Sequence, residues 1–175
     1  MFRIDMEIAL TVQAPFMTQS SAPGPYGLDC VLARNKDGKM YIPGTLVTGH
    51  LREAWEELRD ALGDYHTDEV PTASDVNALL GDELTEGEYA PKTKDLFFSD
   101  FLLCGVAPSP GRRHRIEIDQ QRGAVGKGQL MALEAPFESG KSLIFVGGLS
   151  FESRDEHETP DKIRRQVRCG MQWIS

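Results

Sequence analysis

The chain has 175 residues, of which 40% are apolar and 26% are charged, a balance typical of one globular domain with a substantial core. It contains no apolar run long enough to cross a membrane, and residues 1–5 are unlike a signal peptide. The net charge of −8 argues against a free-standing nucleic-acid binder, because such proteins usually carry a basic surface.

Acidic residues concentrate in the middle of the chain. Residues 53–100 hold 14 aspartates and glutamates against 3 lysines and arginines, so the rest of the chain is mildly basic. Two interpretations of this region stay open. It is either a solvated surface that aids solubility or an acidic face that repels misplaced nucleic acid.

The cysteines and histidines are scattered along the sequence. Cys30, Cys104 and Cys169 are odd in number and show no metal or redox spacing, which indicates reduced thiols in a cytoplasm. The histidines at 50, 66, 114 and 157 form no ligand pair. We therefore expect neither a disulfide nor a metal site built from these side chains.

The N-terminal third predicts a strand, a loop and a hairpin. Residues 2–12 alternate between apolar and polar side chains and predict a half-buried strand. Residues 14–27, rich in Pro, Gly and Ser, predict a long loop of the kind that often carries function. Residues 28–34 and 40–42 are extended, and the Asp-Gly turn between them predicts a hairpin.

A helix is predicted after the turn dipeptide Pro43-Gly44. Thr45 is its expected N-cap and Gly63 its end, and apolar residues recur between them at three- and four-residue spacing. These apolar residues are Val47, Leu51, Ala54, Trp55 and Leu58.

The start of this helix is a candidate binding site. Gly49 would destabilise a helix by about 1 kcal/mol relative to alanine, which suggests the close approach of another backbone or a ligand. Free N–H groups at the helix start, with Arg52 nearby, predict a seat for a phosphate. The alternative is a strand–turn–helix unit that serves packing alone.

Four further elements follow in the second half of the chain. Residues 72–80 predict a short helix capped by Ser74, and residues 96–106 predict a strand buried on both faces. Residues 130–138 and 141–151 predict two strands paired as a hairpin. A last helix starts at 159–161 with a proline at its first position, and its apolar side comprises Ile163, Val167, Met171, Trp173 and Ile174.

Residues 110–128 form a basic, glycine-rich stretch between two of these strands. Five basic side chains face two acidic ones there, which suits contact with a nucleic-acid backbone through phosphate neutralisation. The alternative is an exposed, solvated loop. The basic residues are Arg112, Arg113, Arg115, Arg122 and Lys127.

Three stretches, in this order, resemble motifs of the RAMP superfamily, and specifically of the backbone subunits of type III CRISPR effectors. Residues 42–52, IPGTLVTGHLR, resemble the family signature IPGSSLKGxLR, although Thr48 replaces the lysine that lies on the guide RNA backbone. Residues 96–101, LFFSDF, resemble the FSDA strand. Residues 115–140 resemble the region RxxIxID…GxL…E…G.

This resemblance implies an α+β fold, namely a modified ferredoxin-like (RRM-like) antiparallel sheet with helices on one face and loop or hairpin insertions. It implies one RAMP-like domain over residues 1–175, with an acidic insertion at 64–95 and a basic thumb-like hairpin at 107–129. The family normally continues with a last strand and a Gly-rich loop, so we expect a minimal subunit, a split protein or a fragment.

The resemblance also implies a cytoplasmic subunit that binds guide RNA and target RNA beside neighbouring effector subunits. Its expected RNA-binding residues lie at the helix start and in the basic stretch. They are Thr45, Thr48, Gly49, His50, Arg52, Arg112, Arg113, Arg115, Arg122 and Lys127.

Asp29 has two interpretations. As a residue at the end of a loop, it is expected to accept backbone N–H bonds in a turn. Residues 27–31, GLDCV, also resemble a GIDxPV stretch in which the aspartate cleaves target RNA with a divalent metal, which makes Asp29 a candidate catalytic residue and ligand of Mg²⁺ or Mn²⁺.

Two alternative functions remain open. One is a purely architectural RNA-binding subunit without catalysis. The other is a guide-precursor endoribonuclease that uses His50 or His114 as a general base.

Overall fold

The computed structural model describes residues 2–13, 16, 18, 28–65, 67–81, 94–107, 111–119, 124–135, 140–153 and 159–174. For residues 115–119, 124–130 and 135 it describes the backbone alone. The elements are β1 (Phe2–Gln13), β2 (Tyr41–Ile42), α1 (Gly44–Leu62), α2 (Ala73–Leu80), β3 (Leu96–Phe98), β4 (Phe101–Leu103), β5 (Gly111–Asp119), β6 (Ala124–Ala135), β7 (Ser142–Ser153) and α3 (Pro160–Trp173).

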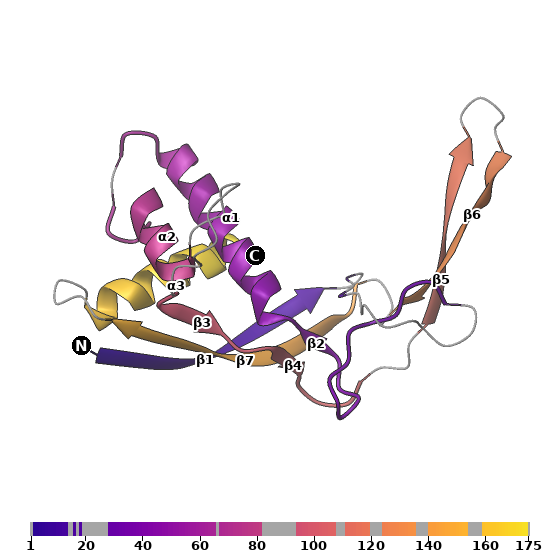
Figure 1. Ribbon diagram of the computed structural model, residues 1–175, viewed down its shortest axis with the longest axis horizontal. Helices are drawn as coiled ribbons and strands as arrows, with labels where there is room; N and C mark the ends of the chain where they lie inside the picture. The colour runs from indigo at the N-terminus through magenta and orange to yellow at the C-terminus, as the bar shows by residue number, and fades with distance from the viewer. Residues whose placement is uncertain are drawn as a thin grey trace, which may run out of the picture. The chain divides into compact units, whose positions relative to one another are not determined.

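The strands form one larger sheet and one ribbon (Figure 1). The larger sheet has the order β1-β7-β4-β2 with β3 also beside β7, and β5 pairs with β6 alone. The pairs β2–β4, β3–β7, β4–β7 and β5–β6 are antiparallel. This mixture of helices and antiparallel strands confirms the expected α+β fold class.

The chain divides into two compact units. Unit 1 comprises residues 1–8, 43–100 and 147–175, and unit 2 comprises residues 9–42 and 101–146. Strands β1 and β7 therefore contribute residues to both units.

In unit 1 the three helices cover one face of the sheet (Figure 1). Helices α1 and α3 pack so closely at Gly170 that an ideal Cβ there would lie 2.5 Å from Leu51 and 2.6 Å from Trp55. The Trp55 indole N–H also donates to the Gln166 carbonyl at 3.0 Å. The buried core of this unit comprises Ile4, Leu51, Trp55, Val76, Leu79, Leu80, Leu96, Leu149, Phe151, Ile163 and Val167.

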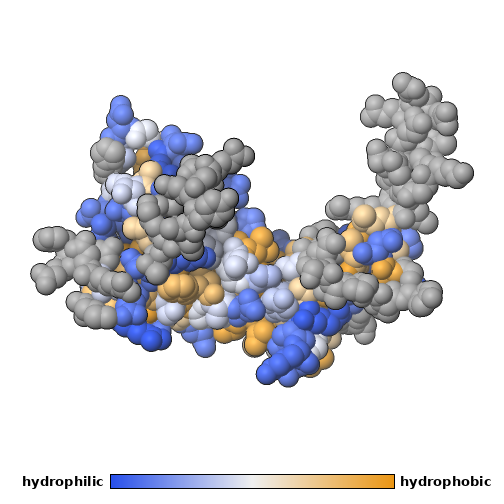
Figure 2. Space-filling model, viewed as in Figure 1, coloured by the Kyte–Doolittle hydropathy of each residue, from blue (hydrophilic) through white to orange (hydrophobic). Residues whose placement is uncertain are grey.

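In unit 2 the buried side chains come from residues 30–33, from Met40 and from strands β2, β4, β6 and β7. They include Leu32, Phe101, Leu133 and Phe145. Hydrophilic residues gather on the turn at 35–39 (Figure 2), where the Gly38 N–H donates to the Asn35 carbonyl at 2.9 Å. The predicted hairpin of residues 28–34 and 40–42 is present as one antiparallel bridge, Arg34 with Met40, and a bond from the Tyr41 N–H to the Ala33 carbonyl at 3.3 Å.

The predicted strand at 96–106 was wrong in two respects. It is interrupted at Ser99 and Asp100, whose side chains bond other segments: the Ser99 hydroxyl accepts from the Gly148 N–H at 2.8 Å. It is also not buried on both faces, since Phe97 is 52% exposed and Leu102 is 36% exposed. The apolar run therefore serves two short strands that each have one exposed face.

The predicted hairpin of residues 130–138 with 141–151 was also wrong. Residues 124–135 belong to β6, which pairs with β5, whereas β7 pairs within the larger sheet. The basic stretch thus lies on a two-stranded ribbon that extends to Ala135. The expected insertion boundaries at 64–95 and 107–129 stay predictions, because residues 82–93, 108–110 and 120–123 lie outside the described residues, as does most of the predicted loop at 14–27.

Helices α2 and α3 are both capped by threonines. Thr159 caps α3, with Pro160 at the first helical position as predicted. Helix α2 is capped by Thr72 rather than the expected Ser74, because Thr72 and Asp75 bond each other's backbone N–H groups.

Trp173 and Ile174 were wrongly placed on the buried side of α3, since they are 49% and 42% exposed. Within the described part of the chain, no helix is long and apolar enough to span a membrane.

Candidate functional site

The ribbon β5–β6 carries the expected basic residues of unit 2. In its register Arg113 lies opposite Leu133 and His114 lies opposite Ala132. The side chains of Arg112, Arg113 and His114 are all exposed. Successive strand residues point to opposite faces, so both faces of the ribbon carry a basic side chain.

Three expected RNA-binding residues of the ribbon are placed less completely. Arg115 lies in β5 and Lys127 in β6, but their side chains lie outside the described residues. Arg122 lies outside them altogether. Their RNA-binding roles stay predictions.

Asp29 is bonded to the outer edge of this ribbon. Its N–H donates to the Ala132 carbonyl at 2.8 Å, and its Oδ2 accepts from the Ala132 N–H at 2.6 Å. Both backbone groups of Ala132, the N–H and the carbonyl, bond Asp29. They are therefore not available to His114 on the other side of β6, and the pair of Ala132 with His114 is of the non-hydrogen-bonded type. The exposed Asp29 carboxylate is therefore held in a fixed position beside the ribbon.

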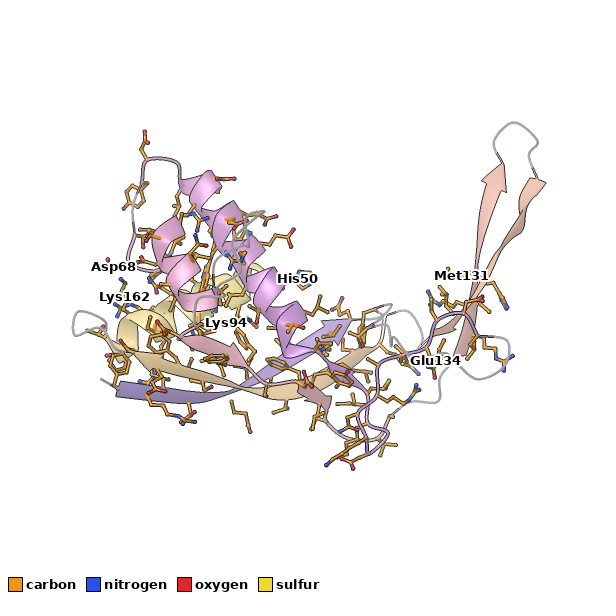
Figure 3. All side chains as sticks on the ribbon, in the orientation of Figure 1. His50, Asp68, Lys94, Met131, Glu134 and Lys162 are labelled. Atoms are coloured by element: carbon orange, nitrogen blue, oxygen red, sulfur yellow. The ribbon has the colours of Figure 1, made fainter. Side chains whose placement is uncertain are left out.

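An ion pair between the exposed Arg34 and the buried Glu134 holds the chain segment that carries Asp29. Glu134, which is 7% exposed and lies at the base of the ribbon (Figure 3), accepts from Arg34 at 2.9 and 2.5 Å. Its Oε2 also accepts from the Leu32 N–H at 2.9 Å. The bonds from Arg34 lower the pKa of Glu134, and the Leu32 N–H adds to this against the effect of burial; the same pair raises the pKa of Arg34.

Sequence reasoning missed this pair. Arg34 and Glu134 are 100 residues apart, and nothing in their local pattern marks them as partners. The one available signal was a charged glutamate in an apolar strand pattern, since buried charges in proteins are normally paired.

The N-terminus of α1 differs from the expected phosphate seat. Its N-cap is Pro43 and not Thr45, and no side chain of the neighbouring sequence caps it. Instead, Asp100 Oδ1 accepts from the Gly44 N–H at 3.0 Å. The Leu46 and Val47 N–H groups bond the Pro43 carbonyl. The Asp100 carboxylate thus binds one of the N–H groups that were expected to be free for a phosphate, and phosphate binding at this helix start stays a prediction.

Gly44, rather than Gly49, is the glycine required by a close approach. An ideal Cβ at Gly44 would lie 2.7 Å from the Ser99 carbonyl oxygen and closer still to that of Phe98. Gly49 is exposed, and apart from its chain neighbours and the backbone of its own helix no atom of the described residues lies within 4 Å of its ideal Cβ position.

The other expected residues of α1 are partly engaged. Thr45 and His50 are exposed, and His50 (Figure 3) lies 3.4 Å from Glu53. The Thr48 hydroxyl donates to the Gly44 carbonyl at 2.9 Å. Arg52 donates to the Asn77 side chain at 3.0 Å and to the Gly81 carbonyl, so its guanidinium links α1 to the end of α2.

The expected site residues therefore fall into two groups. Asp29 and the ribbon arginines belong to unit 2, where Asp29 bonds β6 and Arg112, Arg113 and Arg115 lie on β5, the strand paired with it. The residues of α1 belong to unit 1. Neither His50 nor His114 is bonded to a second candidate catalytic group among the described residues, apart from the contact of His50 with Glu53.

The sequence of the chain matches the model of the RAMP superfamily over residues 13–172. Its structure is similar to a chain of the type III-B Cmr-beta complex, determined by cryo-EM in the apo state, with a TM-score of 0.60 and 12% sequence identity. That likeness covers 89% of this chain and 86% of the other. At this identity it shows a shared fold. No curated protein matches the sequence.

Proposed function

Because the chain belongs to the RAMP superfamily, we propose that it is a subunit of a type III CRISPR RNA-guided effector complex, in which it binds guide RNA beside neighbouring subunits. The family model covers most of the chain, and the fold is shared with a chain of a type III-B complex. At 12% identity this likeness shows the fold alone, so we propose both the membership in such a complex and the binding of its RNA.

The observation that carries the RNA-binding proposal is the basic ribbon. Arg112, Arg113 and His114 are exposed on consecutive positions of β5. A two-stranded ribbon presents side chains on both faces, so it can contact phosphates on two sides without reading sequence. The net charge of −8 makes binding by the isolated chain weak, and neighbouring subunits would complete the RNA groove.

Replacing Arg112 and Arg113 by alanine tests this proposal. In the complex reconstituted with its neighbouring subunits, RNA affinity should fall similarly for all sequences. Each lost phosphate contact should lower the slope of log affinity against log salt by about 0.7–0.9. The matched control is Lys36→Ala with Lys39→Ala, because both lysines are exposed on a turn of the same unit. An unchanged salt slope in the arginine variant would show that the ribbon does not touch RNA.

For target cleavage we propose Asp29 as the catalytic residue and as the protein ligand of Mg²⁺ or Mn²⁺. The described residues hold no group of three or more His, Cys, Asp and Glu side chains that could bind an ion alone. Asp29 therefore fits an ion whose other ligands are RNA phosphate and water, as Mg²⁺ accepts. When bound, such an ion would stabilise negative charge on the phosphate oxygens.

The chain's own contribution is to hold the Asp29 carboxylate still. Oδ2 is fixed by the Ala132 N–H, while no described residue bonds Oδ1. The same hydrogen bond also supports the architectural alternative, because a carboxylate that accepts a backbone N–H stabilises the ribbon without any chemistry.

The comparison of Asp29→Asn with Asp29→Ala separates these two functions. Asparagine keeps an oxygen that can accept the Ala132 N–H but loses the charge that would hold a cation. A cleaving subunit should lose target cleavage in both variants by orders of magnitude and in the presence of EDTA. A structural role predicts that Asp29→Asn behaves like the wild type. Equal cleavage by all three proteins at the sites this subunit covers would remove Asp29 from the mechanism.

The guide-precursor endoribonuclease stays the least supported alternative. Its two candidate bases, His50 and His114, are both exposed, and general base catalysis needs a histidine held within hydrogen-bond reach of the proton it removes. Unchanged processing of a guide precursor after substitution of both histidines by alanine would exclude it.

A further inference from the structure

Apolar side chains gather on the solvent-facing side of the sheet in unit 2. Tyr41 of β2 lies opposite Leu102 of β4, which in turn lies opposite Val146 of β7, so the three side chains form one row across the strands. Ile144, two residues before Val146, extends the same face. Cys104, two residues after Leu102, lies beside Ile144 and donates its N–H to the Ile144 carbonyl at 2.8 Å. We call these five residues the apolar patch; all of them belong to unit 2.

The apolar patch lies on the opposite face from the core of unit 2. Phe101, Leu103 and Phe145 alternate with the residues of the patch and are buried. Ile144 and Leu102, in contrast, are 47% and 36% exposed. An antiparallel sheet that buries one face usually carries polar side chains on the other. Apolar side chains that adjoin one another on the exposed face therefore indicate an interaction surface.

A basic turn borders the apolar patch. Lys39 is exposed and lies two residues before Tyr41, on the same face of the sheet. Asn35 fixes the turn, because its Oδ1 accepts from the Asp37 N–H at 3.0 Å and from the Lys39 N–H at 2.9 Å. Lys36 and Lys39 outnumber Asp37, so the turn is positively charged although the whole chain carries −8. The complementary partner carries acidic side chains beside its apolar contact.

The dimensions of the apolar patch fit one α-helix. Neighbouring strands lie about 4.8 Å apart, so three strands span about 10 Å, which is about the diameter of a helix. An apolar sheet face is normally covered by helices or by a second sheet. Helices α1, α2 and α3 bury their apolar sides within unit 1, so the described part of a second copy offers no free helix of this kind. This points to a different protein as the partner.

A nucleic acid fits the apolar patch less well than a protein does. Proteins hold unpaired bases by stacking them on aromatic side chains or on arginine. Tyr41 is the one aromatic side chain of the patch. Leu102, Ile144 and Val146 are aliphatic and branched, so they offer no flat surface to a base and suit the aliphatic side of a helix.

We propose that the apolar patch and the basic turn dock an amphipathic helix of a neighbouring effector subunit, one with acidic residues beside its apolar side. The proposal rests on the proposed function, because it takes the partner from the same complex. Charges at the rim of an interface act mainly on the association rate. Replacing Lys36 and Lys39 by alanine should therefore slow docking and leave the salt slope of RNA binding unchanged.

Cys104 reports on the apolar patch in the protein as it is. It is exposed, whereas Cys169 is half-buried and Cys30 is buried. Alkylation by N-ethylmaleimide, followed for each cysteine by mass spectrometry, compares the isolated chain with the complex reconstituted with its neighbouring subunits. With subunits at about ten times their dissociation constant, Cys104 should react about tenfold more slowly than in the isolated chain, because only the free patch reacts.

A carbodiimide tests the acidic side of the partner, because it joins an amine directly to a carboxylate. It should link Lys36 or Lys39 to an aspartate or glutamate in a helix of a neighbouring subunit. Links from these lysines to this chain alone would overturn the proposal.

Two variants place a carboxylate in the apolar patch, Ile144→Glu and Leu102→Glu. In each variant the alkylation rate of Cys104 in the complex should return to within about twofold of the rate in the same isolated variant, because the new charge meets apolar and acidic groups of the partner. The matched control is Tyr65→Glu at a 73% exposed residue of unit 1, which should keep the protection. Buried Cys30 stays unreactive in a folded variant and reports on folding.

Equal alkylation of Cys104 in the isolated chain and in an assembled complex would overturn the proposal, as would protection that Ile144→Glu and Leu102→Glu both leave intact. Protection by guide RNA alone would assign the patch to RNA, and protection that rises with the concentration of the isolated chain would assign it to a second copy; both results overturn the proposal. A complex that does not assemble refutes the proposed function and this proposal with it, whereas an assembled complex with unprotected Cys104 refutes this proposal alone.

Discussion

Glu134→Ala removes the centre of the ion pair that holds residues 28–34 on strand β6. The carboxylate accepts three hydrogen bonds, two from Arg34 and one from the Leu32 N–H. Loss of the side chain frees the segment that carries Asp29. We expect a lower free energy of unfolding of unit 2 and faster local opening around this segment.

The magnitude follows from the two kinds of partner. Leu32 is 2% exposed, so its unpaired N–H should cost about 1–3 kcal/mol. The Arg34 side chain is 34% exposed and can regain water, so the loss of its ion pair should add only about 1 kcal/mol. Together Glu134→Ala should lower stability by about 2–4 kcal/mol.

Glu134→Gln is the matched variant, because it keeps an acceptor for the Leu32 N–H and loses the charge. It should cost about 1–2 kcal/mol, the difference between charged and neutral hydrogen bonds. The folded pKa of Glu134 is lowered, so its contribution is present above the unfolded pKa of about 4.3 and is lost as pH falls through the folded value. Wild-type stability should therefore fall more steeply below that pH than the stability of Glu134→Gln.

The assay must report on unit 2. Trp55 and Trp173 both belong to unit 1, so tryptophan fluorescence is not suitable. Urea unfolding followed by far-UV circular dichroism, with hydrogen exchange of residues 28–34 and 131–135, gives global and local values. A double-mutant cycle with Arg34→Ala isolates the pair. Additivity within about 0.5 kcal/mol, together with unchanged exchange in Glu134→Ala, would refute the reasoning.

Three further predictions follow from the contacts described above. Gly44→Ala should destabilise unit 1 by about 2 kcal/mol or more in urea unfolding, because the new methyl group meets the backbone of Phe98 and Ser99. Gly49→Ala is its control and should stabilise the helix by about 0.5–1 kcal/mol, since its surroundings are open; a loss of stability would contradict this. The isolated chain should carry little RNA on purification because of its charge of −8, and sub-micromolar RNA affinity at physiological salt would contradict that.

The regular elements could be predicted wherever one face of an element is buried. The alternation of β1 is seen in the structure, with Ile4 buried between exposed Arg3 and Asp5. The spacing of Val47, Leu51 and Trp55 correctly indicated the buried face of α1. In such elements the period of the apolar residues is a direct consequence of burial on one side.

The failures concern partners that lie far away in the sequence. The strand break at Ser99 and Asp100 depends on Gly148 and Gly44, and neither contact leaves a local pattern. The pairing of β6 with β5 rather than β7 could not be predicted either, because the alternation within one strand does not identify the strand that pairs with it.

The role of Asp29 as a site residue stays a prediction. The sequence predicted that its carboxylate accepts a backbone N–H within a turn; one such bond is present, but its donor lies on β6. The donor, Ala132, is 103 residues away and could not be identified from the sequence. At the helix start the close approach of another backbone is found at Gly44 and not at Gly49, because it depends on the course of residues 98–99. The approach of a ligand to Gly49 stays a prediction.

The most direct test of the account is to locate RNA on this chain within the assembled complex. We propose ultraviolet cross-linking of guide RNA in the complex reconstituted with neighbouring subunits, followed by mass spectrometry of the peptides. The account predicts RNA cross-links on the ribbon, within residues 111–135, and their loss when Arg112 and Arg113 are replaced by alanine. A complex that holds guide RNA with no cross-link to this ribbon, or one that assembles around this chain without RNA, would contradict the central claim.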